Sequence, residues 1–264
     1  MKPDEPLGLV GAGGVNRSFL SRMPALLARL GPVKATSFRV ARRVANGFKA
    51  GYAVPHYAAL EPCPAIFVAV PEAGLDRVLA DLAAQIPLRQ NVVVLCGCVR
   101  DSLSAGPLSA AGARVASLNA IPEARERTFV AEGHPGALRL LRSLLAKEKR
   151  TIVEIRAGAK PLYWAGAHMT TQLLLPWVSA SVRSLCAAGF PRAEATHVAH
   201  QLGAGTLRSW ARIGRKSWRG MADPSLRLTV ERDSGRLTAA DPRLTELYTD
   251  AVRLAIAYFE DPPK

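Results

Sequence analysis

Cysteine is scarce in this sequence of 264 residues. The four cysteines, Cys63, Cys96, Cys98 and Cys186, are too few and too scattered for a disulfide framework. Cys96 and Cys98 could in principle bind a metal or form a strained redox pair, but no second pair of cysteines or histidines stands at ligand spacing. We therefore expect small apolar residues at a strand end and no metal site.

Long apolar runs are also missing. The nearest approach to a membrane-spanning length, residues Leu162–Val182, is interrupted by His168, Gln172 and Pro176, which favours a buried helix. Residues Met1–Pro6 lack the apolar stretch of a signal peptide. We therefore expect a soluble cytoplasmic protein with no membrane partner.

Acidic residues are few: the chain has 21 of them against 35 lysines and arginines, so its net charge is +14. The densest basic segment, Arg208–Arg219, includes Trp210 and Trp218, a mixture that could stack on nucleic-acid bases. The same segment could form the mouth of a site for an anionic substrate, or a solvated helix end whose tryptophans pack inward. Charged faces are ordinarily solvated, so we do not expect nucleic acid as a partner.

Apolar residues make up 49% of the chain, which is ample for a packed core and argues against disorder. Short apolar runs alternate with helical patterns, which predicts a doubly wound parallel α/β sheet of the Rossmann type. The expected strands are Leu7–Val10, Lys34–Phe38, Ala65–Val70, Asn91–Leu95, Arg114–Leu118, Thr128–Val130 and Thr151–Ile155. The expected helices between them are Val15–Leu30, Val40–Phe48, Leu75–Gln85, Leu103–Ala111 and Pro135–Ala146.

The pattern changes after Ala157, where long helical periodicity predicts helices at Lys160–Ala188, Arg192–Ile213 and Pro242–Phe259. A stop signal, Gly189–Pro191, separates the first two. The segment Met221–Ala240 gives no clear pattern. We therefore expect a nucleotide-binding domain over residues 1–156 and an all-α domain over residues 157–264.

A glycine turn follows the first expected strand and precedes a helical segment. This order points backbone N–H groups and a helix N-terminus at a phosphate, so Gly11, Gly13, Gly14, Val15 and Asn16 are candidate dinucleotide contacts. The third position of the turn holds Asn16, where Gly or Ala is usual, so an ordinary tight turn is the alternative.

No acidic residue occurs between Glu5 and Glu61, although a site that selects NAD usually carries one at the end of the second strand. Ser37 and Arg39 stand at that place, and Arg43 follows one helical turn later. A hydroxyl with guanidinium groups suits a phosphate, so we expect the 2′-phosphate of NADP(H) here. The window holds eight basic residues: Arg17, Arg22, Arg29, Lys34, Arg39, Arg42, Arg43 and Lys49.

Several motifs together resemble a known family. They are the Gly-Ala-Gly-Gly turn, the Ser37/Arg39 pair, Ala-Val-Pro-Glu ending at Glu72, and residues Ala159–Tyr163 at the start of a long helix. The sequence resembles a Rossmann-like oxidoreductase family with a C-terminal helical domain of unknown function. That family is related to pyrroline-carboxylate reductase and ketopantoate reductase, in the phosphogluconate dehydrogenase-like superfamily.

The resemblance implies an NADP(H) cofactor in the first domain, a helical domain that forms a homodimer, and an active site between the domains. Val70, Pro71 and Cys96 would border the nicotinamide. A small carbonyl or imine compound would be the substrate, with Lys160 as acid or polariser. Tyr163 and Asn119 would be its hydrogen-bonding partners.

The sequence departs from the family pattern at positions where relatives carry ionisable groups. Trp164 replaces a histidine, Asn119 and Ala120 replace His-Pro, and Pro224–Leu226 replaces Arg-Gly-Asp. Either the substrate differs or catalysis has been lost. The alternative hypothesis is therefore a catalytically silent NADP(H)-binding regulatory or scaffold protein.

Overall fold

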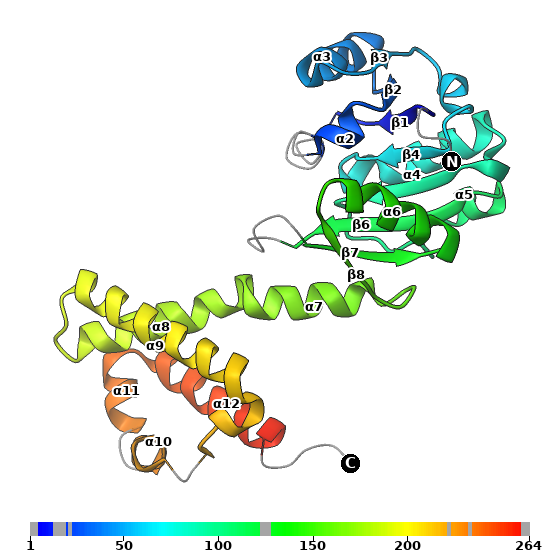
Figure 1. Cartoon of the computed structure of the whole chain (residues 1–264). Coiled ribbons are helices and arrows are strands. Elements are labelled where there is room, and N and C mark those ends of the chain that lie inside the picture. The colour runs from blue at the N-terminus through cyan, green and yellow to red at the C-terminus, as the bar shows by residue number, and fades with distance from the viewer. Residues whose placement is uncertain are drawn as a thin grey trace. The chain divides into compact units, whose positions relative to one another are not determined.

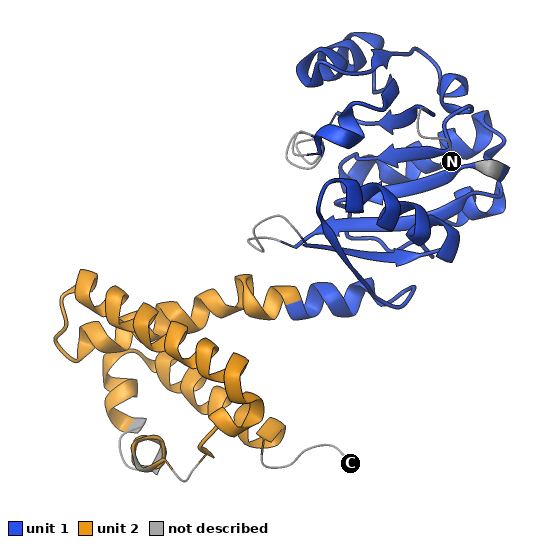
Figure 2. Ribbon diagram, in the orientation of Figure 1, with its two compact units in different colours: residues 1–166 blue, residues 167–264 orange. Residues whose placement is uncertain are grey.

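The computed structural model describes residues 5–12, 20, 23–121, 128–220, 223–231 and 234–259. The chain forms two compact units, Met1–Gly166 and Ala167–Lys264, called unit 1 and unit 2 below (Figure 2). The change from one unit to the other falls within helix α7 (Lys160–Thr170). The functional boundary expected after residue 156 stays a prediction.

Unit 1 is built on an eight-stranded sheet with the order β3-β2-β1-β4-β5-β6-β7-β8 (Figure 1). Neighbouring strands are parallel except β6 and β7, which pair antiparallel. The predicted doubly wound α/β class is therefore confirmed, with one antiparallel pair toward the β8 edge. The strands are β1 (Leu7–Val10), β2 (Leu30–Lys34), β3 (Tyr52–Ala53), β4 (Ala65–Val68), β5 (Val92–Cys96), β6 (Arg114–Ala120), β7 (Thr128–Gly133) and β8 (Thr151–Glu154).

Helices cover both faces of this sheet, and each face has its own core. Strand β5 is continuously apolar because its side chains enter both cores. Val92, Val94 and Cys96 enter one core, while Val93 and Leu95 enter the other. The first core packs against α2 (Pro24–Leu27), α3 (Phe38–Phe48) and α6 (Pro135–Lys147). The second packs against α4 (Glu72–Gln85) and α5 (Gly106–Ala110).

Two sequence-based predictions near the N-terminus are wrong. The second strand is Leu30–Lys34, four residues earlier than the expected Lys34–Phe38, so Leu30 is not part of a helix. Pairing with β1 and β3 holds this segment extended despite its glycine and Pro32. Helix α2 covers only Pro24–Leu27, and residues 15–19, 21 and 22 of the expected helix Val15–Leu30 lie outside the described residues.

This shift also changes the position of Ser37. The residue does not end a strand but caps helix α3, where its Oγ accepts a hydrogen bond from the Val40 N–H at 3.2 Å. Helix α3 accordingly starts at Phe38, two residues before the expected start. Arg39 and Arg43 therefore lie in the first two turns of α3.

Unit 2 is helical, as expected. The long helix predicted over Lys160–Ala188 is interrupted by a 3₁₀ turn at Gln172–Leu174, one turn before Pro176, whose ring excludes a regular helix there. Within the unclear segment 221–240, the described residues include two short helices. Besides the end of α7, the unit contains α8 (Leu175–Ala187), α9 (Arg192–Ile213), α10 (Pro224–Glu231), α11 (Ser234–Ala240) and α12 (Pro242–Phe259).

A buried carboxylate ties the helices of unit 2 together. Asp241, between α11 and α12, forms ion pairs with Arg183 of α8 and with Arg243 of α12. These guanidinium groups hold the pKa of Asp241 below its usual value, first through the hydrogen bond from Arg243. Among the described residues, none of the helices combines the length and the apolar character needed to cross a membrane.

Candidate functional site

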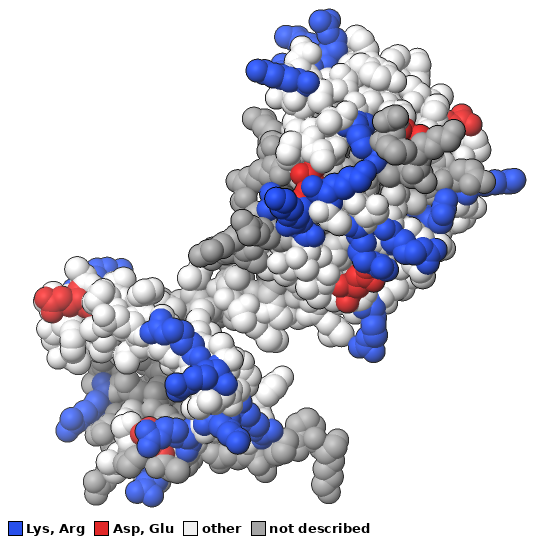
Figure 3. Space-filling view, in the orientation of Figure 1, with Lys and Arg blue, Asp and Glu red and all other residues white. Residues whose placement is uncertain are grey.

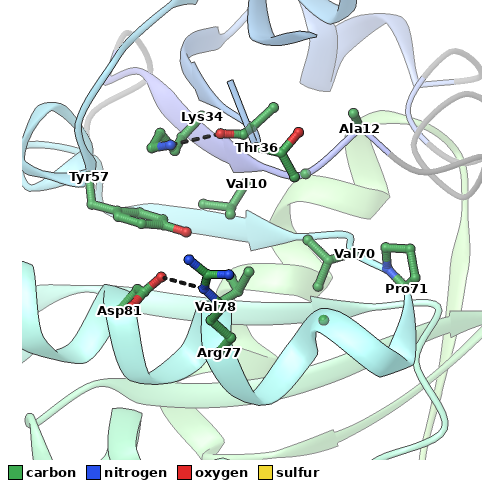
Figure 4. Close-up of a pocket in the computed structure, with 13 residues that line it drawn as sticks. Val10, Ala12, Lys34, Thr36, Tyr57, Val70, Pro71, Arg77, Val78 and Asp81 are labelled. Carbon is green, nitrogen blue, oxygen red and sulfur yellow. Dashed lines mark hydrogen bonds and ion pairs between the residues drawn. The ribbon is translucent and has the colours of Figure 1, made fainter. Parts of the chain in front are cut away.

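A cavity of about 570 Å³ opens at the carboxyl ends of β1, β2 and β4 in unit 1 (Figure 4). Parallel strands place their carboxyl ends at one edge of the sheet, where open α/β folds bind their ligands. The lining residues come from these strand ends, the 3₁₀ turn Tyr57–Leu60 and helix α4. They are Val10, Gly11, Ala12, Lys34, Ala35, Thr36, Tyr57, Val70, Pro71, Gly74, Arg77, Val78 and Asp81.

Gly11 brings the backbone close to this cavity. Its φ is +116°, and a Cβ at this position would lie 2.1 Å from the Ala69 carbonyl oxygen, so only glycine fits. The Gly11 N–H donates to the Lys34 carbonyl at 2.8 Å, which joins the glycine turn to the end of β2. The other predicted turn contacts, Gly13, Gly14, Val15 and Asn16, lie outside the described residues.

Two sides of the cavity carry polar groups. On the β2 side, the Lys34 ammonium donates to the Ala35 carbonyl at 2.7 Å and lies 5.0 Å from the ring centroid of Tyr57. On the α4 side, Arg77 pairs with Asp81 at 3.8 Å (Figure 4). Sequence reasoning did not identify Tyr57, Arg77 or Asp81 as lining residues, because nothing in their spacing signals that they face β2.

Arg39 and Arg43 lie together in a separate hollow of about 390 Å³ on α3, which Phe38, Arg42 and Asn46 complete. Both arginines are exposed, and the described residues of α3 include no acidic group to neutralise them. Basic side chains also outnumber acidic ones on the face of the molecule drawn in Figure 3. The structure therefore brings the predicted pair together beside Ser37, outside the lining of the larger cavity.

Val70 and Pro71 line the cavity, but Cys96 does not. Cys96 ends β5 with its side chain in the α3/α6-side core, where its thiol donates to the Val94 carbonyl at 3.6 Å. Burial raises the pKa of this thiol. Its side chain is therefore committed to the core, and only its backbone remains for a ligand.

Lys160 is buried, and only 1% of its surface is exposed to solvent. Its ammonium donates to the Arg100 carbonyl at 2.6 Å and to the Cys98 sulfur at 3.6 Å. Burial lowers the pKa of Lys160, and the neighbouring Cys98 and Glu132 partly oppose this effect. An ammonium has three donors, and no third acceptor is found among the described residues.

Asn119 belongs to the same buried polar cluster. Its amide nitrogen donates to the Cys98 carbonyl at 3.1 Å, while its oxygen is buried and unpartnered among the described residues. The Tyr163 hydroxyl is likewise buried without a described partner, and burial raises its pKa. The structure thus connects Lys160 and Asn119 through Cys98, and it gives no hydrogen bond that links Tyr163 to them.

Glu132 is the member of this cluster that sequence reasoning missed. It is 1% exposed and lies on β7 directly opposite Ser117 of β6, so both side chains occupy the same face of the sheet. Its carboxylate accepts hydrogen bonds from the Ser102 N–H at 2.8 Å, the Ser102 hydroxyl at 2.7 Å, the Ser117 hydroxyl and the Gly158 N–H at 3.4 Å. A glutamate directly after the apolar run Phe129–Ala131, still within the expected pattern of a buried strand, was the available signal.

The loop after β5 is held on its outer side as well. The Arg100 guanidinium forms ion pairs with Glu72 at 3.0 Å and with Asp76, both on α4. Glu72 also accepts from the Val99 N–H at 3.1 Å. Within the described ranges, no group of three or more histidine, cysteine or acidic side chains could hold a metal ion.

Comparisons with known proteins find similarity in structure and not in sequence. Neither the protein-family models nor the curated proteins give a match. A protein from Thermotoga maritima matches with a TM-score of 0.68 and 20% identity, over 97% of this chain and 98% of the other.

Two solved enzymes match over similar lengths. An imine reductase variant from Myxococcus stipitatus in complex with NAD+ has a TM-score of 0.69 and 13% identity, over 98% of this chain and 95% of the other. A reductive aminase from Aspergillus terreus in complex with NADPH and ethyl-5-oxohexanoate gives 0.65 and 14%, over 96% and 94%. The chain shares their fold. This agrees with the Rossmann-like oxidoreductase family that the sequence motifs resemble.

Proposed function

We propose that this chain is an NADP(H)-dependent oxidoreductase that transfers a hydride between the nicotinamide and a small carbonyl or imine compound. The observation that carries the proposal is the cavity at Gly11, which lies at the sheet edge where Rossmann folds bind dinucleotides. Solved proteins of the same fold contain NAD+ or NADPH, which supports this assignment.

The residues present fit such a cofactor. Gly11 lets the backbone approach a ligand, and the largely apolar cavity wall suits a base and sugar. We propose that Ser37, Arg39 and Arg43 bind the 2′-phosphate, because arginine can bond phosphate with two N–H groups. Lys34 adds a positive charge at the strand end where an acidic residue would select NAD.

At the other end of the cofactor, we propose that Val70, Pro71 and the Cys96 backbone border the nicotinamide, which supplies or accepts the hydride. The third N–H of Lys160 would polarise the oxygen or nitrogen of the substrate. The unpartnered Asn119 oxygen would accept a hydrogen bond from substrate or cofactor, and the Tyr163 hydroxyl would be a second polar partner. The buried environment strengthens each of these interactions.

A catalytically silent NADP(H)-binding protein is the second candidate, and the burial of Lys160 favours it. The ammonium already donates to two acceptors and is 1% exposed, so a substrate would have to reach its remaining donor. Such a protein would keep the cofactor contacts of the cavity and of α3. It would act as a regulatory or scaffold protein.

Turnover separates the two candidates. NADPH oxidation would be followed by the loss of nicotinamide absorbance with panels of keto and imino compounds. The proteins compared would be wild type, Lys160→Met and the control Arg139→Ala, which removes an exposed charge from α6. Oxidoreductase activity predicts turnover in wild type and in the control, and its loss in Lys160→Met. Cofactor binding without turnover on any compound would support the silent protein, and equal rates in all three proteins would exclude Lys160 from the site.

We also propose that unit 2 mediates a homodimer. Large apolar side chains are exposed along its helices, including Met169 at 62%, Leu202 at 62% and Tyr258 at 71%. Exposed apolar surface of this extent favours association. Light scattering after size-exclusion chromatography should give twice the chain mass of 28.2 kDa, and a monomer across the micromolar range would contradict the proposal.

A further inference from the structure

The loop Cys98–Ser102, which connects β5 to the segment before α5, is held by buried groups from three other parts of unit 1. Lys160 binds the Arg100 carbonyl and the Cys98 sulfur, and Asn119 binds the Cys98 carbonyl. Glu132 binds both the N–H and the hydroxyl of Ser102. The loop is therefore fixed at both of its ends.

Glu132 also contacts the chain just before Lys160. Its second carboxylate oxygen accepts from the Gly158 N–H at 3.4 Å, two residues before Lys160 begins α7. One buried side chain thus bonds to the loop, to strand β6 through Ser117 and to the segment that carries Lys160. Removing it would loosen the loop and the start of α7 at the same time.

Stability alone does not explain a carboxylate at this position. Burying an ionised group carries a large desolvation cost, and well-packed apolar residues often serve stability as well or better. A carboxylate can accept several hydrogen bonds at once from donors in different segments, and it thereby fixes the positions of those segments relative to one another. The four donors around Glu132 come from three separate segments, which is what a positioning role requires.

We propose that Glu132 is a positioning residue that holds the loop Cys98–Ser102 and the start of α7 in their places at the carboxyl edge of the sheet. The functional part rests on the proposed function, which places the nicotinamide at this edge. Glu132 itself touches neither substrate nor cofactor. It acts through the loop and through Lys160.

The reactivity of Cys98 tests the loop directly and needs no cofactor. Cys98 is 5% exposed, so iodoacetamide reaches it only when the loop opens. Peptide mass mapping would compare its labelling rate in wild type, Glu132→Gln and Glu154→Gln, with the partly exposed Cys186 as internal reference. Glu154 is the matched control, because it lies on neighbouring β8 and bonds to the exposed Arg142 at 2.5 Å.

We expect labelling of Cys98 to rise about 10- to 100-fold in Glu132→Gln, the effect of losing one hydrogen bond to a buried charge, and to stay at the wild-type rate in Glu154→Gln. Ser102→Ala and Ser117→Ala test the same point if Glu132→Gln does not fold. Ser102→Ala should accelerate labelling more than Ser117→Ala, because only Ser102 belongs to the loop. Equal labelling of Cys98 in wild type and in these variants would overturn the proposal.

The fluorescence of bound NADPH tests the functional part. In Glu132→Gln the emission change of the nicotinamide should be reduced, while the dissociation constant stays within about twofold, because the contacts at Ser37 and α3 are independent of Glu132. Faster labelling with unchanged emission would overturn the positioning role. If wild type gives no NADPH signal at all, the proposed function fails, and the labelling rates still decide whether Glu132 holds the loop.

Discussion

The cavity at Gly11 and the polar cluster around Glu132 lie in the same unit but differ in how completely their polar groups are bonded. In the cluster, Glu132 and Lys160 are each 1% exposed and bond to groups of the protein itself. At the cavity, the Arg77 side chain is 89% exposed and pairs only loosely with Asp81. The Glu132 carboxylate is bonded by groups of the protein itself, whereas the charged side chains at the cavity remain largely open to solvent.

This difference predicts where substitutions should act. Changes in the cluster should reduce the free energy of unfolding, because they leave buried groups without partners. Changes to exposed side chains around the cavity and on α3 should leave stability nearly unchanged and reduce affinity for a dinucleotide.

Glu132→Ala should have the largest effect. It removes the carboxylate from beside the buried Lys160 and leaves the Ser102 donors unsatisfied, so the free energy of unfolding should fall by about 3–5 kcal/mol. Urea denaturation at neutral pH measures the change. Glu154→Ala, which removes an exposed ion pair, should cost at most about 1 kcal/mol. Similar losses in the two variants would contradict the contrast between cluster and surface.

The buried Cys63 in the core behind the cavity should make the protein less stable at alkaline pH. Burial raises the pKa of the Cys63 thiol from 9.0 to about 11, so the folded protein keeps a proton that the unfolded chain releases. Stability should therefore fall as pH rises from 9 to 11, by about 2–3 kcal/mol for this residue. Over the same pH range, the free energy of unfolding of Cys63→Ala should fall by about 2–3 kcal/mol less than that of wild type. Identical pH dependence in both proteins would show that Cys63 is not buried as described.

Gly11→Ala should affect both stability and binding. The left-handed φ and the close Ala69 carbonyl predict a loss of about 1–3 kcal/mol and weaker binding of NADPH and NADH alike. Gly47→Ala is the control, since a Cβ there meets open space on α3 and should stabilise the helix by about 0.5–1 kcal/mol. Thermal unfolding and titration of the same samples measure both quantities. Unchanged affinity of Gly11→Ala for both dinucleotides would show that the glycine turn does not contact the ligand.

The double variant Arg39→Ala/Arg43→Ala should have the smallest effect on stability, within about 0.5 kcal/mol, because both side chains are exposed. Its affinity for NADPH should fall about 10-fold or more, while its affinity for NADH stays the same. Arg139→Ala again serves as control. Equal weakening for both cofactors would place the 2′-phosphate away from α3.

Much of the fold follows from the sequence because the central strands are continuously apolar. Residues 65–70, 91–95 and 114–118 predict β4, β5 and β6 to within two residues at each end. The second strand could not be placed, since Gly31 and Pro32 do not favour a strand and only pairing with β1 and β3 makes one. The sequence pattern therefore identifies a strand when a continuous run of apolar side chains marks it as buried. It misses a strand that only pairing with its neighbours keeps extended.

The candidate site was predictable only in part. The glycine turn and Val70 follow from their position after strands, which fixes the edge that they occupy. Lys160 was expected to act as acid or polariser, and its bonds to Arg100 and Cys98 join residues about sixty positions apart. Such contacts between distant segments depend on the folded chain, and no spacing rule encodes them.

Paired titrations of the wild-type protein with NADPH and NADH decide whether this chain binds a dinucleotide through its 2′-phosphate. Nicotinamide fluorescence gives both dissociation constants under one set of conditions, at low ionic strength where phosphate contacts are strongest. We expect NADPH to bind at least about 10-fold more tightly than NADH, because of the charge-assisted bonds to its 2′-phosphate. Absence of binding, or tighter binding of NADH, would contradict this expectation.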